Sequence, residues 1–240
     1  MACLDVVFSP LEILPEADCW LVVDLLRATT TIVAFFELGG RRLLPVVDLD
    51  EARSLRDRLP GRWLLMGERQ ALPPPGFDLG NSPLDLAAFD LGAFDGAVMT
   101  TTNGTAALLA AAGRGGALHA ACARNARAVA EAVAAHDRIA ILCAGLEGRP
   151  ALDDTACAGL LVERLLALRP RDLSDGARMA LALFRSAPFA DLVGQSRHGR
   201  RLAALGLAAD LAYCCERDRS EGRPRLVFEG GRPVLVDGRC

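Results

Sequence analysis

Lysine is missing from this sequence of 240 residues, and all 27 basic residues are arginine. The chain therefore has no amine for Schiff-base or pyridoxal phosphate chemistry and no lysine for a Walker-type phosphate loop. Histidine is scarce, and His119, His136 and His198 share no motif, which predicts surface or structural roles for each. Neither a Ser-His-Asp triad nor an HExxH zinc motif is present.

A long apolar segment is also missing. The longest run without a charged residue spans residues 96–113, and the polar letters TTTNGT at its centre are incompatible with a bilayer. Asp5 and Glu12 interrupt the first apolar residues, which argues against a signal peptide. The net charge of −3 provides no basic surface for a nucleic acid. We therefore expect a cytoplasmic protein with no membrane and no nucleic-acid partner.

The eight cysteines occur without CxxC pairs and without histidines at zinc spacing, so reduced and mostly buried thiols are expected. One of them, Cys143, opens the segment CAGLEGR, which matches the C-x₅-R spacing of phosphatases that use a thiolate. A reactive thiolate needs a positive environment, whereas Glu147 adds a negative charge to this loop and Pro150 removes a backbone N–H. A cysteine nucleophile is therefore disfavoured.

Hydrophobic residues form 52% of the chain and charged residues 24%, which is the balance of a folded protein. An apolar run followed by a polar loop and a helical segment occurs three times, beginning at residues 20–23, 96–99 and 138–142. This repetition predicts a parallel sheet flanked by helices. Weaker patterns predict strands at 42–46 and 63–66, a helix at 50–59 and two short strands within residues 225–236.

The expected fold class is α/β, with a mostly parallel or mixed sheet flanked by helices and two lobes that hold the site in a cleft. The length favours one domain over residues 1–240. A connector near residues 168–176 would separate lobes of about 1–170 and 171–240. Three prolines at residues 73–75 predict a stiff, extended connector before the segment GFDLGNSP.

Ligands of open parallel sheets bind where the strands end, and the polar residues of this chain are concentrated in the loops expected there. Hydroxyl side chains precede the predicted helices, where they either cap the helix or form an anion site with its free N–H groups. The three loops carry Asp24, Arg27, Thr29, Thr30 and Thr31; Thr100, Thr101, Thr102, Asn103, Gly104 and Thr105; and Glu147, Arg149, Asp153, Asp154 and Thr155.

Four carboxylates have both a chemical and a structural interpretation. Asp24, at the end of an apolar run, is a ligand for a hard cation such as Mg²⁺, a solvent-facing residue or a helix cap. Glu68 is either a second ligand or half of a structural salt bridge with Arg69. Asp78 offers a ligand oxygen or ordinary turn chemistry. Asp154 either caps the next helix, binds a metal or positions the attacking water.

Seven blocks, in order along the chain, together resemble the 2-phosphosulfolactate phosphatase family. They are VVDLLRATTTIV, GER, GFDLGNSP, TTTNGT, ILCAG, DDTACAGLLVE and LGLAADLAYCCERDRS, within a match from residue 4 to residue 236. The resemblance implies an α/β fold and an Mg²⁺-dependent phosphatase that hydrolyses (R)-2-phospho-3-sulfolactate to 3-sulfolactate and phosphate in coenzyme M biosynthesis. Two alternatives remain: the enzyme acts on another phosphorylated 2-hydroxy acid, or the protein is a non-catalytic sensor of such acids.

The family motifs imply site positions in this sequence. Catalysis is expected from Asp24, Arg27, Glu68 and Asp154, and Mg²⁺ binding from Asp24, Glu68 and Asp78. The substrate carries about four negative charges, so arginine and Mg²⁺ are needed to offset their repulsion. Contacts with the substrate and its phosphate are expected from Arg27, Thr29, Thr30, Arg69, Asn81, Ser82, Thr101, Thr102, Asn103, Gly104, Thr105 and Asn125.

The expected reaction is direct in-line attack by water. Arg27 and the threonine loops would hold the phosphoryl oxygens, and Asp154 would orient the water. A phosphoaspartyl intermediate at Asp24 is the second route. The expected partner is a small anionic phosphorylated substrate, and a homodimer is the default assembly.

The chain also departs from the family pattern at three places. Gln70-Ala71 stands where Gly-Gly is frequent, Leu146 where threonine is frequent, and Asp153 where glutamate is frequent. The shorter carboxylate at position 153 makes Asp154 the better candidate of that pair. The missing hydroxyl at position 146 is expected to alter substrate contacts.

Overall fold

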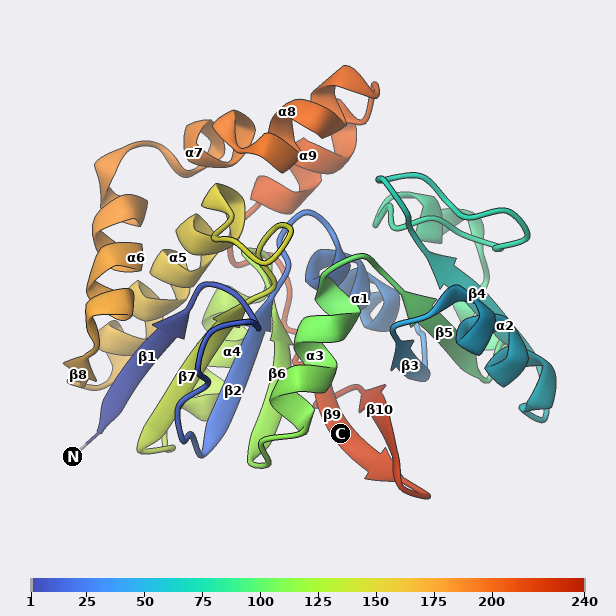
Figure 1. Ribbon diagram of the computed structural model, residues 1–240, viewed down its shortest axis with the longest axis horizontal. Coiled ribbons are helices and arrows are strands. Elements are labelled where there is room, and N and C mark those ends of the chain that lie inside the picture. The colour runs from blue at the N-terminus through green and yellow to red at the C-terminus, as the bar shows by residue number, and fades with distance from the viewer. Residues whose placement is uncertain (1, 240) are drawn as a thin grey trace.

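A computed structural model describes residues 2–239 as one ten-stranded sheet with helices on both faces (Figure 1), which confirms the expected α/β class. The strands are β1 (Cys3–Val7), β2 (Cys19–Val23), β3 (Arg42–Val46), β4 (Trp63–Gly67), β5 (Gly96–Thr100), β6 (Ala117–Ala121), β7 (Arg138–Cys143), β8 (Asp172–Leu173), β9 (Arg225–Glu229) and β10 (Arg232–Val236). The α-helices are α1 (Ala28–Glu37), α2 (Leu49–Arg58), α3 (Gly104–Ala112), α4 (Ala126–Val133), α5 (Leu152–Leu168), α6 (Asp175–Ser186), α7 (Phe189–Gln195), α8 (Arg197–Ala204) and α9 (Ala208–Cys215).

The sheet consists of two parallel sections joined by an antiparallel hairpin. One section has the strand order β6-β2-β7-β1-β8 and the other β4-β5-β3, with β9 and β10 between them. The hairpin makes few pairs with its neighbours, because β10 meets β3 only through Leu235 and Val236, and β9 meets β6 only at His119. In Figure 1 the hairpin lies at the lower edge, and α7, α8 and α9 lie across the top.

Strand β2 shows how the sheet is held in place. All five of its residues are buried, as expected of a parallel strand covered on both faces. Successive side chains point to opposite faces, so Leu21 and Val23 join the core beneath α4 and α5, whereas Trp20 and Val22 join the core beneath α1 and α3. Each such side chain stabilises the fold by roughly 1.5–3 kcal/mol, which also fixes the loop that follows the strand.

The segment after residue 170 contributes to several parts of the fold. Helix α6 packs on α5 and β1, helices α7 and α9 pack on one another, and the hairpin completes the sheet. Further upstream, residues 73–76 contain neither helix nor strand, as their prolines predict. The chain then runs beside β4, where Leu79 pairs with Met66.

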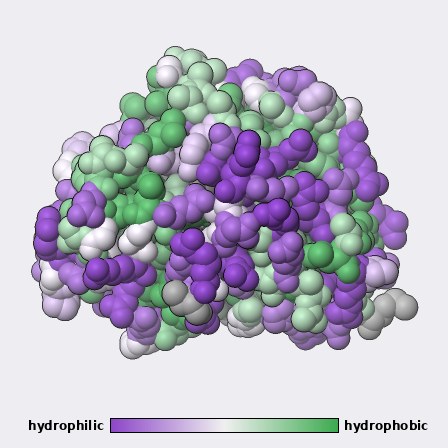
Figure 2. All heavy atoms as spheres, turned by 180° about the vertical axis from the view of Figure 1, so that it is seen from behind, coloured by the Kyte–Doolittle hydropathy of each residue, from purple (hydrophilic) through white to green (hydrophobic). Residues whose placement is uncertain are grey.

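The surface mixes polar and apolar side chains. Figure 2 shows hydrophilic residues across much of one face, with apolar areas between them. Within the part of the chain that the structure describes, no helix combines the length and the apolar character needed to span a membrane.

Candidate active site

A pocket of about 360 Å³ lies where the loops after β2, β4, β5 and β7 meet helix α8. Both parallel sections of the sheet contribute to it, at the edge where ligands of such sheets bind. Its charged wall residues are the carboxylates Asp24, Glu68 and Glu147 and the basic side chains Arg27, Arg69, Arg201 and His198.

Asp24 is the first residue after β2 and is 6% exposed. Its Oδ1 accepts a hydrogen bond from the Ala28 N–H at 3.3 Å, at the start of α1. Helix α3 begins so close that a Cβ on Gly104 would lie 2.5 Å from Asp24 Oδ2. Burial raises the pKa of Asp24 to about 6, against the opposing charge of His198. A cation beside this carboxylate would offset the cost of burying its charge.

Glu68 connects the two loops of the β4–β5 section. Its Oε2 accepts a hydrogen bond from the Ala71 N–H at 2.8 Å, and its Oε1 accepts one from the Thr102 N–H at 2.8 Å. Each carboxylate oxygen keeps a further lone pair for a ligand. Glu68 therefore joins the loops and also presents oxygen atoms to the pocket.

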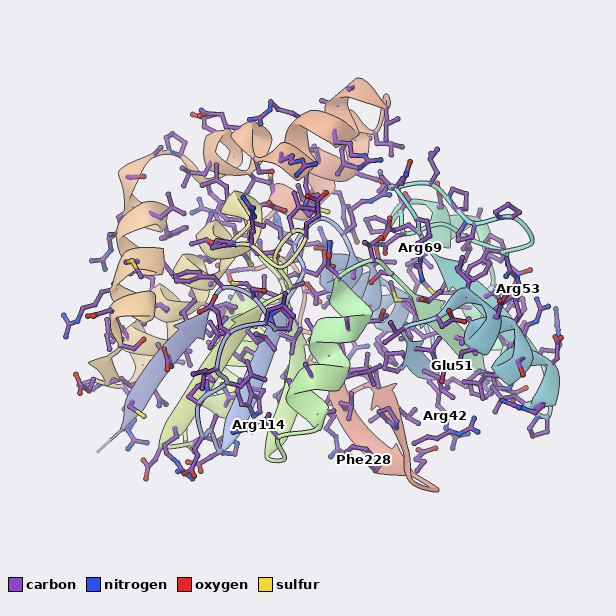
Figure 3. The ribbon with its side chains drawn as sticks, in the orientation of Figure 1. Arg42, Glu51, Arg53, Arg69, Arg114 and Phe228 are labelled. Atoms are coloured by element: carbon purple, nitrogen blue, oxygen red, sulfur yellow. The ribbon has the colours of Figure 1, made fainter. Side chains whose placement is uncertain are left out.

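Arg69 lies two residues after the end of β4 (Figure 3). Its guanidinium is held in place by hydrogen bonds to uncharged oxygen atoms. It donates to the carbonyl oxygens of Glu68 and Val47 at 2.7 and 2.8 Å and to the Thr100 hydroxyl at 3.0 Å. Among residues 2–239 it forms no ion pair, so the structural salt bridge with Glu68 is absent. Its charge therefore favours an anion in the pocket.

Arg27 is anchored by a partner far away in the sequence. It forms an ion pair with Asp210 of α9, in which the two side chains are 3% and 4% exposed, and donates to the Ala71 carbonyl at 2.7 Å. The Ser82 hydroxyl donates to the other Asp210 oxygen at 2.8 Å. Ser82 thus supports Arg27 from outside the pocket. The sequence analysis identified Arg27 and Ser82 but not Asp210.

Asn81 presents an unusual polar group to the pocket. The residue is 3% exposed, and within residues 2–239 its Oδ1 has no hydrogen-bond partner. The Thr31 hydroxyl donates to the backbone carbonyl of Asn81 at 3.1 Å and holds this residue against α1.

Asp78 of the same segment does not line the pocket. Its Oδ2 accepts the Leu65 N–H at 2.7 Å and lies 3.9 Å from Arg56.

Most of the expected phosphate-binding hydroxyls are used inside the protein. Thr29 and Thr30 each donate to a backbone carbonyl just after β2 at 2.9 Å. Thr101 and Thr105 each accept the other's backbone N–H, at 3.0 and 3.2 Å. These four side chains position loops, although the N-cap residues of α1 and α3 themselves make no side-chain capping hydrogen bond. From the second loop, the pocket is lined by Thr102 and Asn103.

Asp154 and Asn125 are also buried away from the pocket. Asp154 accepts the Leu25 N–H through Oδ1 at 2.8 Å and the Gly145 N–H through Oδ2 at 2.9 Å. Asn125 accepts the Cys122 N–H at 2.8 Å, at the start of α4. Both side chains connect loops, and neither lines the pocket.

Helix α8 brings two side chains to the pocket that the sequence analysis did not place there: it expected a surface or structural role for His198 and did not consider Arg201. His198 and Arg201 both line the pocket, at the i, i+3 spacing that puts two residues on one helix face. His198 Nδ1 lies 3.2 Å from Asp153 Oδ2, and Arg201 donates to the Gln70 carbonyl at 3.0 Å. The only sequence signal was this spacing within RHGRR.

The surroundings of Cys143 are those of a structural thiol and not of a nucleophile. It is fully buried and does not line the pocket. Burial, together with the charges of Asp154 and Asp153, raises the pKa of its thiol well above the ordinary value. The expectation of reduced cysteines is met by the seven within residues 2–239, which are all free thiols.

The pocket residues fit Mg²⁺ through their donor chemistry. No three His, Cys, Asp or Glu side chains between residues 2 and 239 are grouped as a complete metal site. Mg²⁺, however, is commonly held by one or two carboxylates with water and substrate phosphate. Asp24, Glu68 and the unpartnered Oδ1 of Asn81 are oxygen donors of this kind on one pocket. Asp78 lies outside it.

The fold and the pocket define an α/β protein with a charged binding site for a small ligand at the ends of its strands. A family model described as 2-phosphosulpholactate phosphatase matches residues 8–227. Three relatives carry the name "Probable 2-phosphosulfolactate phosphatase". The protein of Deinococcus radiodurans is 42% identical over 90% of this chain and 92% of its own length. That of Thermus thermophilus is 40% identical over 94% and 95%, and that of Pseudothermotoga lettingae 37% over 90% and 92%.

The chain belongs to the 2-phosphosulfolactate phosphatase family. The resemblance read from the seven sequence blocks is thereby confirmed, and the protein is a phosphoric monoester hydrolase. The sensor alternative finds no support among these relatives.

Proposed function

We propose that this enzyme hydrolyses (R)-2-phospho-3-sulfolactate, or a closely related phosphorylated 2-hydroxy acid, to the hydroxy acid and phosphate in an Mg²⁺-dependent reaction of the coenzyme M type. The observation that carries the proposal is one pocket that combines Asp24 and Glu68 with three arginines. The relatives' printed names support the substrate class.

The balance of charge in the pocket suits a polyanion. Arg69 and Arg201 donate only to neutral oxygens and so keep their charge for a ligand, whereas Arg27 is paired with Asp210. A phosphate ester that also bears a carboxylate and a sulfonate has about four negative charges, which bidentate arginine donors bind well. We assign the phosphoryl group to the side nearest Asp24, Thr102 and Asn103. The acidic substituents of the substrate then face Arg69 and Arg201.

Asp24, Glu68 and the Oδ1 of Asn81 would hold Mg²⁺. When bound, the ion supplies positive charge to the phosphoryl oxygens as the ester bond breaks. The protein itself orients the ester through Arg27, whose guanidinium is held by Asp210 and by the Ala71 carbonyl. Pre-ordered donors of this kind stabilise developing charge because they do not reorganise during the reaction.

We propose direct attack by water on phosphorus. Asp24 is deeply buried and one of its oxygens accepts a backbone hydrogen bond, which disfavours it as the nucleophile of a phosphoaspartyl route. Acid quenching of the enzyme during turnover of ³²P-labelled substrate tests this step. The expected result is no label on the protein, and label that is lost in an Asp24→Asn variant would overturn water attack.

The function is tested by phosphate release from (R)-2-phospho-3-sulfolactate with Mg²⁺ and with a chelator. Turnover is expected with Mg²⁺ and is expected to vanish in the chelator. Asp24→Asn and Glu68→Gln should abolish turnover, whereas Glu163→Gln, on α5 in an ion pair with Arg185, should retain it. Tight binding of the ester without turnover would contradict the proposal, as would full activity in the chelator.

A further inference from the structure

His198 is a pocket residue to which the proposed function gives no chemical task. It lies near the start of α8, after the cap formed by Ser196, and its side chain is 18% exposed. The helix directs it to the wall that it shares with Arg201 and Leu202. A histidine held over a pocket that contains the carboxylate Asp24 is placed for proton transfer.

The ring of His198 is oriented by a buried carboxylate. Asp153, 1% exposed in the first turn of α5, lies 3.2 Å from Nδ1 through its Oδ2. Nε2 has no hydrogen-bond partner within the described residues, so it is the nitrogen left for the pocket. A carboxylate behind the imidazole fixes which nitrogen carries the reactive proton, which is the arrangement of many proton-transferring histidines.

The surrounding charges keep His198 protonated. Burial alone lowers the pKa of His198, but the hydrogen bond to Asp153 and the charges of Asp153, Asp154 and Asp24 outweigh burial and raise it to about 9. The other charged groups around the pocket are Arg27, Glu68, Arg69, Glu147 and Arg201. At neutral pH the side chain is therefore an imidazolium, which is an acid and not a base.

We infer that His198 is the general acid of the reaction and that Asp153 is its positioning residue, an inference that rests on the proposed phosphatase function. The oxygen of water forms a bond to phosphorus as the bond from phosphorus to the ester oxygen breaks. The leaving oxygen takes the proton from His198 Nε2 and departs as the hydroxyl of the 2-hydroxy acid. The attacking water gives up one proton to solvent, and His198 regains one, so ester and water become alcohol and phosphate.

The leaving group explains why an acid is needed. The alkoxide of a 2-hydroxy acid is a strong base that leaves poorly, whereas 4-nitrophenolate leaves readily without a proton. A positioned general acid contributes about 10²–10⁴-fold for a leaving group of the first kind. The ratio of the two activities therefore separates an acid from a residue that merely shapes the pocket.

The decisive experiment measures kcat of wild type and His198→Gln with (R)-2-phospho-3-sulfolactate and with 4-nitrophenyl phosphate. We expect about a 10²-fold or greater fall with the first ester and less than a tenfold fall with the second. His136→Gln, in the loop between α4 and β7 and outside the pocket, should change neither. Equal losses on both esters, or no loss on the first, would overturn the assignment. A wild type that cleaves neither ester refutes the proposed function instead.

A second measurement does not depend on turnover. The His198 ring protons, assigned by their disappearance in His198→Gln, are titrated by NMR in wild type and in Asp153→Asn. We expect a midpoint near 9 that falls in the variant, together with a matching shift of the alkaline limb of kcat. A midpoint and a pH profile that Asp153→Asn leaves unmoved would overturn the role of Asp153.

Discussion

The buried pair of Arg27 and Asp210 gives the sharpest test of how the site is held together. Both side chains are almost fully excluded from water, and the Asp210 carboxylate also accepts the Ser82 hydroxyl. Asp210→Asn keeps the shape of the side chain but removes its charge, so the Arg27 charge stays buried without its counterion. Removing one partner of a buried pair costs about 3–5 kcal/mol.

The assay is urea unfolding, followed by the fluorescence of buried Trp20, together with thermal unfolding. The expected loss of about 3–5 kcal/mol corresponds to a fall in Tm of roughly 6–20 °C for a chain of this size. Glu163→Gln is the matched control, because its ion pair with Arg185 is 32% and 60% exposed. An exposed pair of this kind contributes about 0–1 kcal/mol.

The double variant separates stability from function. Arg27→Met with Asp210→Leu removes both charges, so it should be more stable than Asp210→Asn alone while remaining inactive. The reasoning is refuted if Asp210→Asn is no less stable than Glu163→Gln. It is equally refuted if the double variant recovers turnover, because Arg27 would then have no part in holding the ester.

Four further outcomes are expected. Ala71→Gly should raise the free energy of unfolding by about 1 kcal/mol, measured in urea, because alanine stands there at φ +69°. Gly104→Ala should lower stability by about 1–3 kcal/mol and reduce phosphate release, because its Cβ would meet Asp24 Oδ2 at 2.5 Å. Stability should fall as pH rises from 6.5 through about 9, since folding raises the pKa of His198 and favours its charged form, and His198→Gln should flatten that decline. Cys143→Ser should retain turnover in the phosphate-release assay, because a buried thiol of raised pKa is no nucleophile.

Much of the sheet follows from local pattern. Strands β2 and β7 consist mainly of apolar residues, as strands of a covered sheet require, and β2 is followed directly by the polar residue Asp24. Strand β6 was not predicted, because its sequence ALHAA lacks the β-branched and aromatic residues that favour strands. The place of the β9–β10 hairpin between two parallel sections depends on pairs with distant strands, which no local pattern encodes.

The residues of the candidate site could likewise be predicted only in part from the sequence. Residue type and position after a strand were enough to select Asp24, Glu68 and Arg69, and the family motif in GFDLGNSP implied Asn81; all four line the pocket. The same reasoning selected Thr29, whose hydroxyl instead donates to a backbone carbonyl. A hydroxyl before a helix can bind either the loop or a ligand, and only its direction in space separates the two.

By itself the sequence determined the α/β class, the family and the kinds of side chain available for phosphate ester hydrolysis. The tertiary structure decided which of those side chains share one pocket. It brought Asp210 and His198 from the last quarter of the chain to loops near its beginning. The physical reason is that chemistry depends on distances of a few ångströms, and these are set by packing between segments that the chain order leaves far apart.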